Sequence, residues 1–218
     1  MGRTYRRYQR LSGFVALVLL LLATLIFSLL RPNYNHLQQA FSELGALGAP
    51  NFALFNIIVF GFVGLLMVHF QYELDLYFSD FMDPVLRLVQ LGAAISWILT
   101  GVFPLSHAIH WLYITHLVFA VLSYIFGGLT LILSVKLFGE RTDFTLFSIF
   151  SIWMLGGVWG AIPMSYSVLS PELAQLIAIF SYFCWQAVYS VLLFLKDNPD
   201  SSSNYIFSEQ NIIVDIED

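Results

Sequence analysis

The sequence predicts an all-α integral membrane protein with six transmembrane helices in one bundle. Hydrophobic residues make up 59% of the chain and charged residues 11%, whereas a soluble domain contains about 45–50% and about 25% of these classes. The mean hydropathy is +0.79. The apolar residues are concentrated in runs without the polar face that a helix on a soluble protein shows. This composition excludes a soluble enzyme, a disordered protein and a nucleic-acid-binding protein.

Each predicted transmembrane helix is defined by its length. A crossing helix needs roughly 17–25 mostly apolar residues, because each residue rises about 1.5 Å through about 30 Å of hydrocarbon. The segments that meet this requirement are residues 11–30, 52–72, 85–103, 111–135, 144–163 and 173–195. The first is too long for a signal-peptide core and has no cleavage site after it, so we expect a retained anchor.

The placement of lysine and arginine predicts the orientation. With the N-terminus in the cytoplasm, the outer loops contain only Arg31 of the 9 basic residues. The cytoplasmic segments then contain the others, which are Arg3, Arg6, Arg7, Arg10, Arg87, Lys136, Arg141 and Lys196. Because basic residues are retained on the cytoplasmic side, this distribution favours six spans with both termini inside. Without other targeting signals, we expect the bacterial plasma (inner) membrane.

The segments outside the spans differ in character. Residues 1–10 are basic, and residues 197–218 form an acidic tail that we expect to be disordered in the cytoplasm. In the first outer loop, residues 36–47 have apolar residues at helical spacing, which predicts a short amphipathic helix on the outer surface. We place an inner loop at residues 73–84 and expect no Asp or Glu inside a span, which disfavours ion-coupled transport.

The polar residues that could carry function gather on the predicted outer side. They are His36, Ser42, Glu43, Asn56, His107, His110 and His116. In one interpretation, Glu43 and the last three histidines bind a divalent metal ion or act as acid and base, which suits hydrolysis of a lipid or its head group. In another, the residues form a pocket that holds a head group without reacting with it. In a third, they cap helix ends and face water.

The second interpretation is the one we favour. It makes membrane lipids the expected ligands and requires neither a cofactor nor a nucleic acid. Besides the membrane-embedded hydrolase, one further alternative is a structural subunit that contacts a protein partner or a second copy through its helix faces and acidic tail. Small residues that recur on the predicted helices, such as Gly127 and Gly128, allow such close helix contact.

Two short motifs resemble those of a known family. The first is SELGALGAPNFALFN at residues 42–56, and the second is GVFP at residues 101–104, followed by His107 and His110. Together they resemble the uncharacterised six-span membrane family known as domain of unknown function 998, which is distantly similar to the Frag/DRAM/Sfk group. The resemblance covers residues 10–196 and implies lipid or membrane handling but no established catalytic residue. It directs attention to Ser42, Glu43, Gly45, Asn56, Pro104 and His107.

Overall fold

The computed structural model describes residues 8–78, 82–139, 145–164 and 169–196, without the side chains of 162–164. These residues contain helices and no strand. The elements are α2 (Ser12–Leu30), η1 (Phe41–Gly45), α3 (Phe52–Phe55), η2 (Asn56–Phe62), α4 (Val63–Tyr77), α5 (Pro84–Val102), α6 (His110–Gly139), α7 (Thr145–Met164) and α8 (Pro171–Lys196). The acidic tail and the basic residues Arg3, Arg6, Arg7 and Arg141 lie outside the described residues.

The helices confirm an α-helical membrane bundle. In the described part of the chain, 5 helices are long and apolar enough to cross a membrane. These are α2, the continuous helix α3–η2–α4, α5, α6 and α8. Helix α7 is also apolar but shorter in its fully described part. Because apolar side chains surround each helix, the helices bury one face in the bundle and leave the other for lipid.

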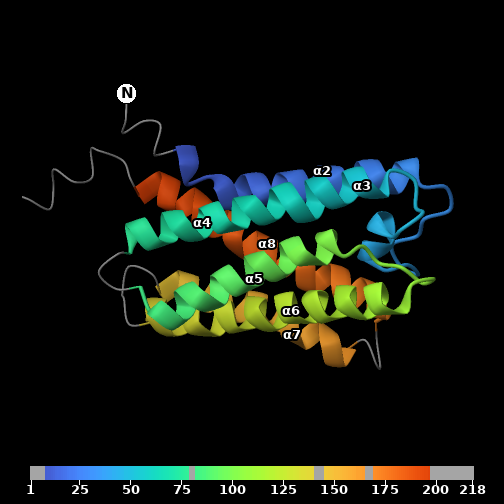
Figure 1. Ribbon diagram of the computed structural model, residues 1–218. Helices are drawn as coiled ribbons and strands as arrows, with labels where there is room; N and C mark the ends of the chain where they lie inside the picture. Colours follow the sequence, from blue (N-terminus) through green and yellow to red (C-terminus); the bar gives the residue numbers. More distant parts are fainter. Residues whose placement is uncertain (1–7, 79–81, 140–144, 165–168, 197–218) are drawn as a thin grey trace, which may run out of the picture.

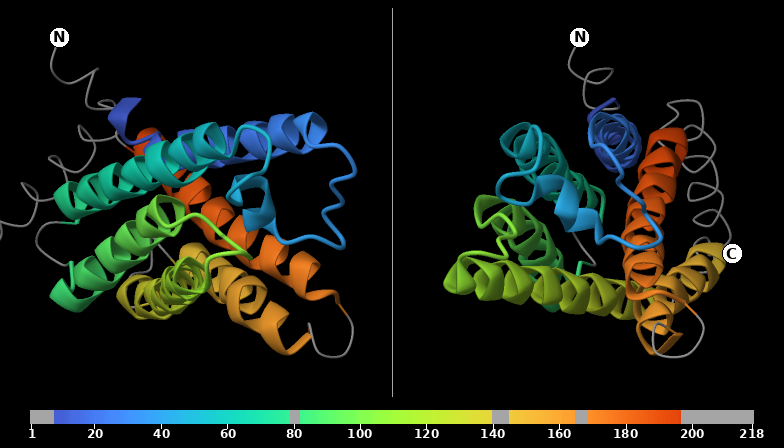
Figure 2. Two further views of the ribbon diagram at one scale, coloured as in Figure 1. Left: turned by 45° about the vertical axis from the view of Figure 1, so that its right-hand side comes forward. Right: turned by 90° about the vertical axis from the view of Figure 1, so that its right-hand side faces the viewer.

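Neighbouring helices form a closed ring (Figures 1 and 2). Helix α2 packs on α4, α4 on α5, α5 on α6, α6 on α7 and α7 on α8. Helix α8 then returns to α2, where the Gly13 amide donates a hydrogen bond of 2.9 Å to Ser190 Oγ. A Cβ atom at Gly13 would lie 2.7 Å from the Gln186 carbonyl oxygen, so the close approach of these helices requires glycine. The ring encloses a core rich in aromatic side chains, such as Phe55 and Trp185.

The second long helix is not uniform. Its segment η2 (Asn56–Phe62) is a π-helix between the α-helical segments α3 and α4. Such segments shift the hydrogen-bonding register of the backbone and are frequent at functional sites. Here the Trp97 indole Nε1 donates a hydrogen bond of 2.8 Å to the Val59 carbonyl within η2.

The inner loop is shorter than the sequence predicted. We expected it to begin at Glu73, but helix α4 continues to Tyr77. The Glu73 side chain is 5% exposed, and its Oε2 atom lies 3.9 Å from Nε of Arg10. A hydropathy pattern cannot show this pairing, because Arg10 lies before α2 and reaches Glu73 only in the folded bundle. The candidate span Phe52–Tyr77 therefore contains Glu73 and Asp75, contrary to the expectation that no Asp or Glu lies inside a span.

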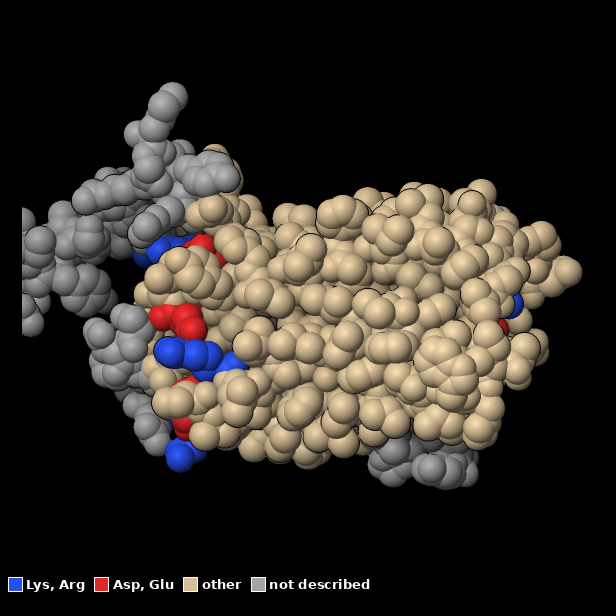
Figure 3. Space-filling model, in the orientation of Figure 1, with Lys and Arg blue, Asp and Glu red and all other residues tan. Residues whose placement is uncertain are grey.

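On the face that Figure 3 shows, the charged side chains of the described residues lie at the two ends of the bundle. One end carries Arg10 with Glu73 and also the pair Asp75–Arg87, whose Oδ2 and Nε atoms are 2.8 Å apart. The opposite end, which we call the loop end, holds residues 31–51 and 103–109. Between the ends, the visible surface is free of charged side chains over the width that apolar helices would occupy in a membrane.

The predicted amphipathic helix at 36–47 is wrong. Only the short 3₁₀ helix η1 (Phe41–Gly45) forms there, and it enters the loop end of the ring instead of lying on the surface. Phe41 and Leu44 are each 1% exposed, and Phe41 packs on the rings of Phe55, Phe60 and Trp97. Apolar residues at helical spacing fit a surface helix, but they fit equally well a loop that inserts two side chains into a core. The spacing alone therefore does not distinguish the two.

Candidate functional site

The candidate site is at the loop end, where two loops meet. The Leu47 amide donates a hydrogen bond of 2.7 Å to the Leu105 carbonyl, which joins the first loop to the α5–α6 loop. The first loop is also attached to α8, because Gln175 Oε1 accepts a hydrogen bond of 2.9 Å from the Phe41 amide. Ser170 Oγ donates another, of 2.9 Å, to the Leu37 carbonyl. The first loop is therefore attached to the α5–α6 loop by one hydrogen bond and to the start of α8 by two.

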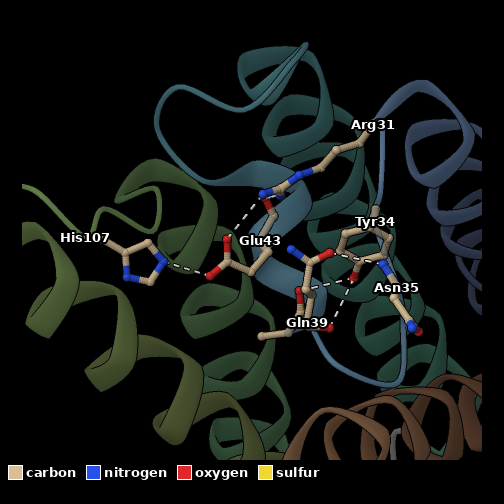
Figure 4. A network of polar contacts seen from close by, with 7 residues as sticks. Arg31, Tyr34, Asn35, Gln39, Glu43 and His107 are labelled. Atoms are coloured by element: carbon tan, nitrogen blue, oxygen red, sulfur yellow. Dashed lines mark hydrogen bonds and ion pairs between the residues drawn. The ribbon is translucent and has the colours of Figure 1, made fainter.

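Three ionisable side chains meet at this junction, and we call them the Arg31–Glu43–His107 cluster (Figure 4). Glu43 Oε1 lies 2.7 Å from His107 Nε2, and Glu43 Oε2 lies 3.5 Å from Arg31 Nη2. Arg31 Nη1 also donates a hydrogen bond to the Glu43 carbonyl. The Glu43 side chain is 19% exposed and that of His107 is 66% exposed. The carboxylate thus lies between a half-buried guanidinium and an imidazole that is open to its surroundings.

Tyr34 and His36 form the side of the site next to the cluster. The Tyr34 hydroxyl donates a hydrogen bond of 3.1 Å to the Ala40 carbonyl, and Arg31 lies over the Tyr34 ring at 5.6 Å. Burial raises the pKa of Tyr34 to about 12; Arg31 opposes this shift and Glu43 adds to it. The His36 ring packs edge-on against Tyr34, and burial lowers the pKa of His36. Both side chains are therefore neutral at neutral pH.

Asn56 and Gly45 join the first motif to the second helix. Asn56 Nδ2 donates a hydrogen bond of 2.9 Å to the Gly45 carbonyl. A Cβ atom at position 45 would overlap with Asn56 Oδ1 and would lie 2.8 Å from Phe55 Cδ1. The residue must therefore be glycine for the loop to reach this helix. Ser42 is also buried, at 7% exposure.

His116 lies deeper in the bundle and has a different role. Its side chain is buried, and Nδ1 lies 3.0 Å from the Thr100 carbonyl and 2.9 Å from the Phe103 carbonyl. Carbonyl oxygens only accept hydrogen bonds, so Nδ1 carries the proton. His116 thereby satisfies backbone oxygens at the end of α5 that have no partner within the helix. It also lines a small cavity with Ser42 and Gln175.

The seven predicted site residues do not meet at one point. Glu43 and His107 are in direct contact, Ser42 and Asn56 lie just inside the bundle, and His116 caps α5. His110 is exposed at the first position of α6, and His107 precedes this helix, so the two histidines do not share a helix face. In the described ranges, no three His, Cys, Asp or Glu residues are grouped to hold a metal ion. The predicted metal-ligand set is therefore not assembled.

Sequence reasoning missed three residues of the site. Arg31 is the basic residue that the predicted topology places in an outer loop, and it could have been assigned as the partner of Glu43 in the same loop. Gln175 follows the Pro171 at the start of α8 by one helical turn, and Tyr34 lies beside Arg31 in the same loop. Neither of the last two carries a sequence signal, because their contacts are tertiary.

Comparisons with known proteins identify no relative. No family model matches the chain, and no curated protein or solved structure matches it significantly.

The two motifs are nevertheless brought together in space. Residues 42–56 contact residues 101–107 through Glu43–His107 and through Leu47–Leu105. Gly101 also lies against Phe60, where an added Cβ atom would overlap with the Phe60 side chain. Together, the motif residues make up one packed unit at the loop end.

Proposed function

We propose that this chain is a six-span protein of the bacterial plasma membrane that binds a lipid head group at the Arg31–Glu43–His107 cluster. Both termini are cytoplasmic in this proposal, and the loop end faces outward. The single observation that supports it most is a compact cationic and anionic cluster at the loop end, next to a visible surface without charged side chains. Lipid head groups carry charges at this depth, and Arg is well suited to bind phosphate.

The geometry favours binding over hydrolysis. The hydrolytic alternative needs Glu43 with His107, His110 and His116 around one substrate atom. Of these histidines, His107 contacts the carboxylate, whereas His116 is occupied by the α5 carbonyls and His110 is exposed on α6. An exposed imidazole beside a half-buried carboxylate provides polar contacts for a head group.

Lipid co-purification tests the proposed binding. The full chain and the Glu43→Ala/His107→Ala variant are purified in mild detergent, and bound lipids are quantified by mass spectrometry. We expect the variant to retain several-fold less phospholipid. His110→Ala is the matched control, because this histidine is also at the loop end but is outside the cluster. Equal retention by all three proteins would contradict a head-group site.

Cysteine labelling tests the orientation separately. In a Cys184→Ala background, Ala108→Cys places a thiol on the exposed α5–α6 loop, and Lys196→Cys places one at the opposite end. A membrane-impermeant maleimide should label position 108 in intact spheroplasts and position 196 only after permeabilisation. The reverse pattern would overturn the proposed topology.

A further inference from the structure

An apolar groove lies on the surface of the bundle between the second helix and α5. Its volume is about 430 Å³, within the range of roughly 300–1,000 Å³ that small-molecule sites occupy. Its walls are formed by the α3–η2 segment and the last turns of α5, next to the loop end. Its lining includes Phe52, Ala53, Gly61, Leu65, Gly101 and Pro104.

The shape of the groove follows from the π-helix and from two glycines. Gly101 lets α5 approach Phe60, and Trp97 binds the Val59 carbonyl, so η2 is fixed against α5 from the inside. Gly61 is on the open side: the nearest atom to an added Cβ there is the Asn56 carbonyl oxygen, at 3.8 Å. The floor of the groove is therefore open because position 61 has no side chain.

The surroundings of the groove identify its occupant. Rim residues such as Leu65 and Val102 are more than half exposed and apolar, as expected for side chains that face hydrocarbon. At the loop end, Pro104 on the rim is followed by Leu105, which is bonded to Leu47, and by the exposed His107. A chain lying in the groove would thus have its polar end beside the Arg31–Glu43–His107 cluster.

We infer that the groove holds one acyl chain of a zwitterionic phospholipid. This inference rests on the proposed head-group site and adds the class of lipid. The cluster presents both signs of charge, so the phosphate is matched by Arg31 and the ammonium group by Glu43. Packing of the chain against Gly61 and Gly101, in addition to the head-group contacts, distinguishes this lipid from its freely exchanging neighbours.

Photolabelling tests the inference. The full chain is reconstituted in liposomes of phosphatidylethanolamine and phosphatidylglycerol that contain phosphatidylethanolamine with a diazirine on one acyl chain. After irradiation, labelled peptides are mapped by mass spectrometry. We expect residues 52–65 and 98–104 to be labelled several-fold more than the exposed α7 residues Ile152 and Trp153. Uniform labelling of all lipid-facing helices would overturn the inference.

A matched pair of glycine variants sharpens the test. Gly61→Leu fills the groove and should reduce its labelling several-fold. Gly156→Leu is the control, because an added Cβ atom at this exposed position on α7 meets no atom within 4 Å. Ala53→Phe, which fills the groove from its other wall, should reproduce the effect if Gly61→Leu fails to fold. Unchanged labelling in a folded groove-filling variant would contradict the inference.

Two further results separate the inference from the proposed function. In the first, Glu43→Ala/His107→Ala loses lipid retention, but groove labelling is unaffected by Gly61→Leu. This result would support the head-group site and contradict the acyl-chain site in the groove. Groove labelling that depends on Gly61 but not on Glu43 and His107 would support the acyl-chain site and overturn the head-group site. A disulfide-linked dimer of Leu65→Cys in the Cys184→Ala background would show a second copy in the groove and also overturn the inference.

Discussion

The Nε2 atom of His107 lies 2.7 Å from the Oε1 atom of Glu43, which joins two loops 64 residues apart in the sequence. A carboxylate oxygen only accepts hydrogen bonds, so the proton is on Nε2 of His107. With Arg31 on its other side, Glu43 holds both loops over the end of the bundle. The same contact is therefore the centre of the proposed ligand site and a structural connection.

A double-mutant cycle measures the strength of this connection. Glu43→Gln and His107→Gln are each expected to lower Tm, and the double variant should lose less than the sum of the two. Because His107 is 66% exposed, we expect a coupling free energy of about 0.5–1 kcal/mol. Thermal unfolding in detergent provides the measurement, with His110→Gln as control. Strict additivity would mean that the pair does not contribute to stability.

The Gly45–Asn56 contact predicts a steric effect. Gly45→Ala places a Cβ atom against Asn56 and Phe55, and we expect a loss of about 1–3 kcal/mol as in other overpacked sites. Gly156→Ala, with open space at its Cβ position, is the control and should have a small effect. Tm of both variants is compared with that of the native chain. A Gly45→Ala protein as stable as the control would show that the loop moves without cost.

The Arg10–Glu73 pair predicts an effect at the opposite end. Arg10→Gln leaves the buried Glu73 carboxylate without its cation, and removal of one partner of a buried pair costs up to about 3–5 kcal/mol. Arg10 is partly exposed and the pair is 3.9 Å apart, so we expect the lower part of this range or less. Arg10→Gln/Glu73→Gln should be more stable than Arg10→Gln alone. The opposite order in thermal unfolding would show that Arg10 acts through its other contacts.

The half-buried His36 predicts a pH dependence. Burial lowers its pKa below the ordinary value of 6.5, so the unfolded chain binds a proton in a pH range where the folded chain does not. The contribution of His36 to stability is thus complete above about pH 6.5 and is lost as the pH falls below that value. His36→Gln should reduce the loss of Tm on acidification. An unchanged pH profile would contradict a neutral, half-buried imidazole at this position.

The long helices were predictable from the sequence, whereas most of the candidate site was not. Apolar runs fix helices in a membrane protein because every backbone group must be bonded within the helix. The placement of Phe41, the pairing of Glu73 with Arg10 and the capping of α5 by His116 all depend on tertiary contacts. The amino-acid sequence also does not predict the π-helical register of η2, since this segment is stabilised by a hydrogen bond from Trp97 on another helix.

Closure of the ring by α2 and α8 has a consequence for biosynthesis. The face of α2 that carries Ala16 and Leu20 is fully buried, and Ser190 of α8 bonds the α2 backbone at Gly13. While the ribosome is still translating the intervening segments, this face must be shielded by lipid or by the insertion machinery. Lipid or the insertion machinery therefore occupies the place of α8 against α2 until Pro171–Lys196 has been synthesised.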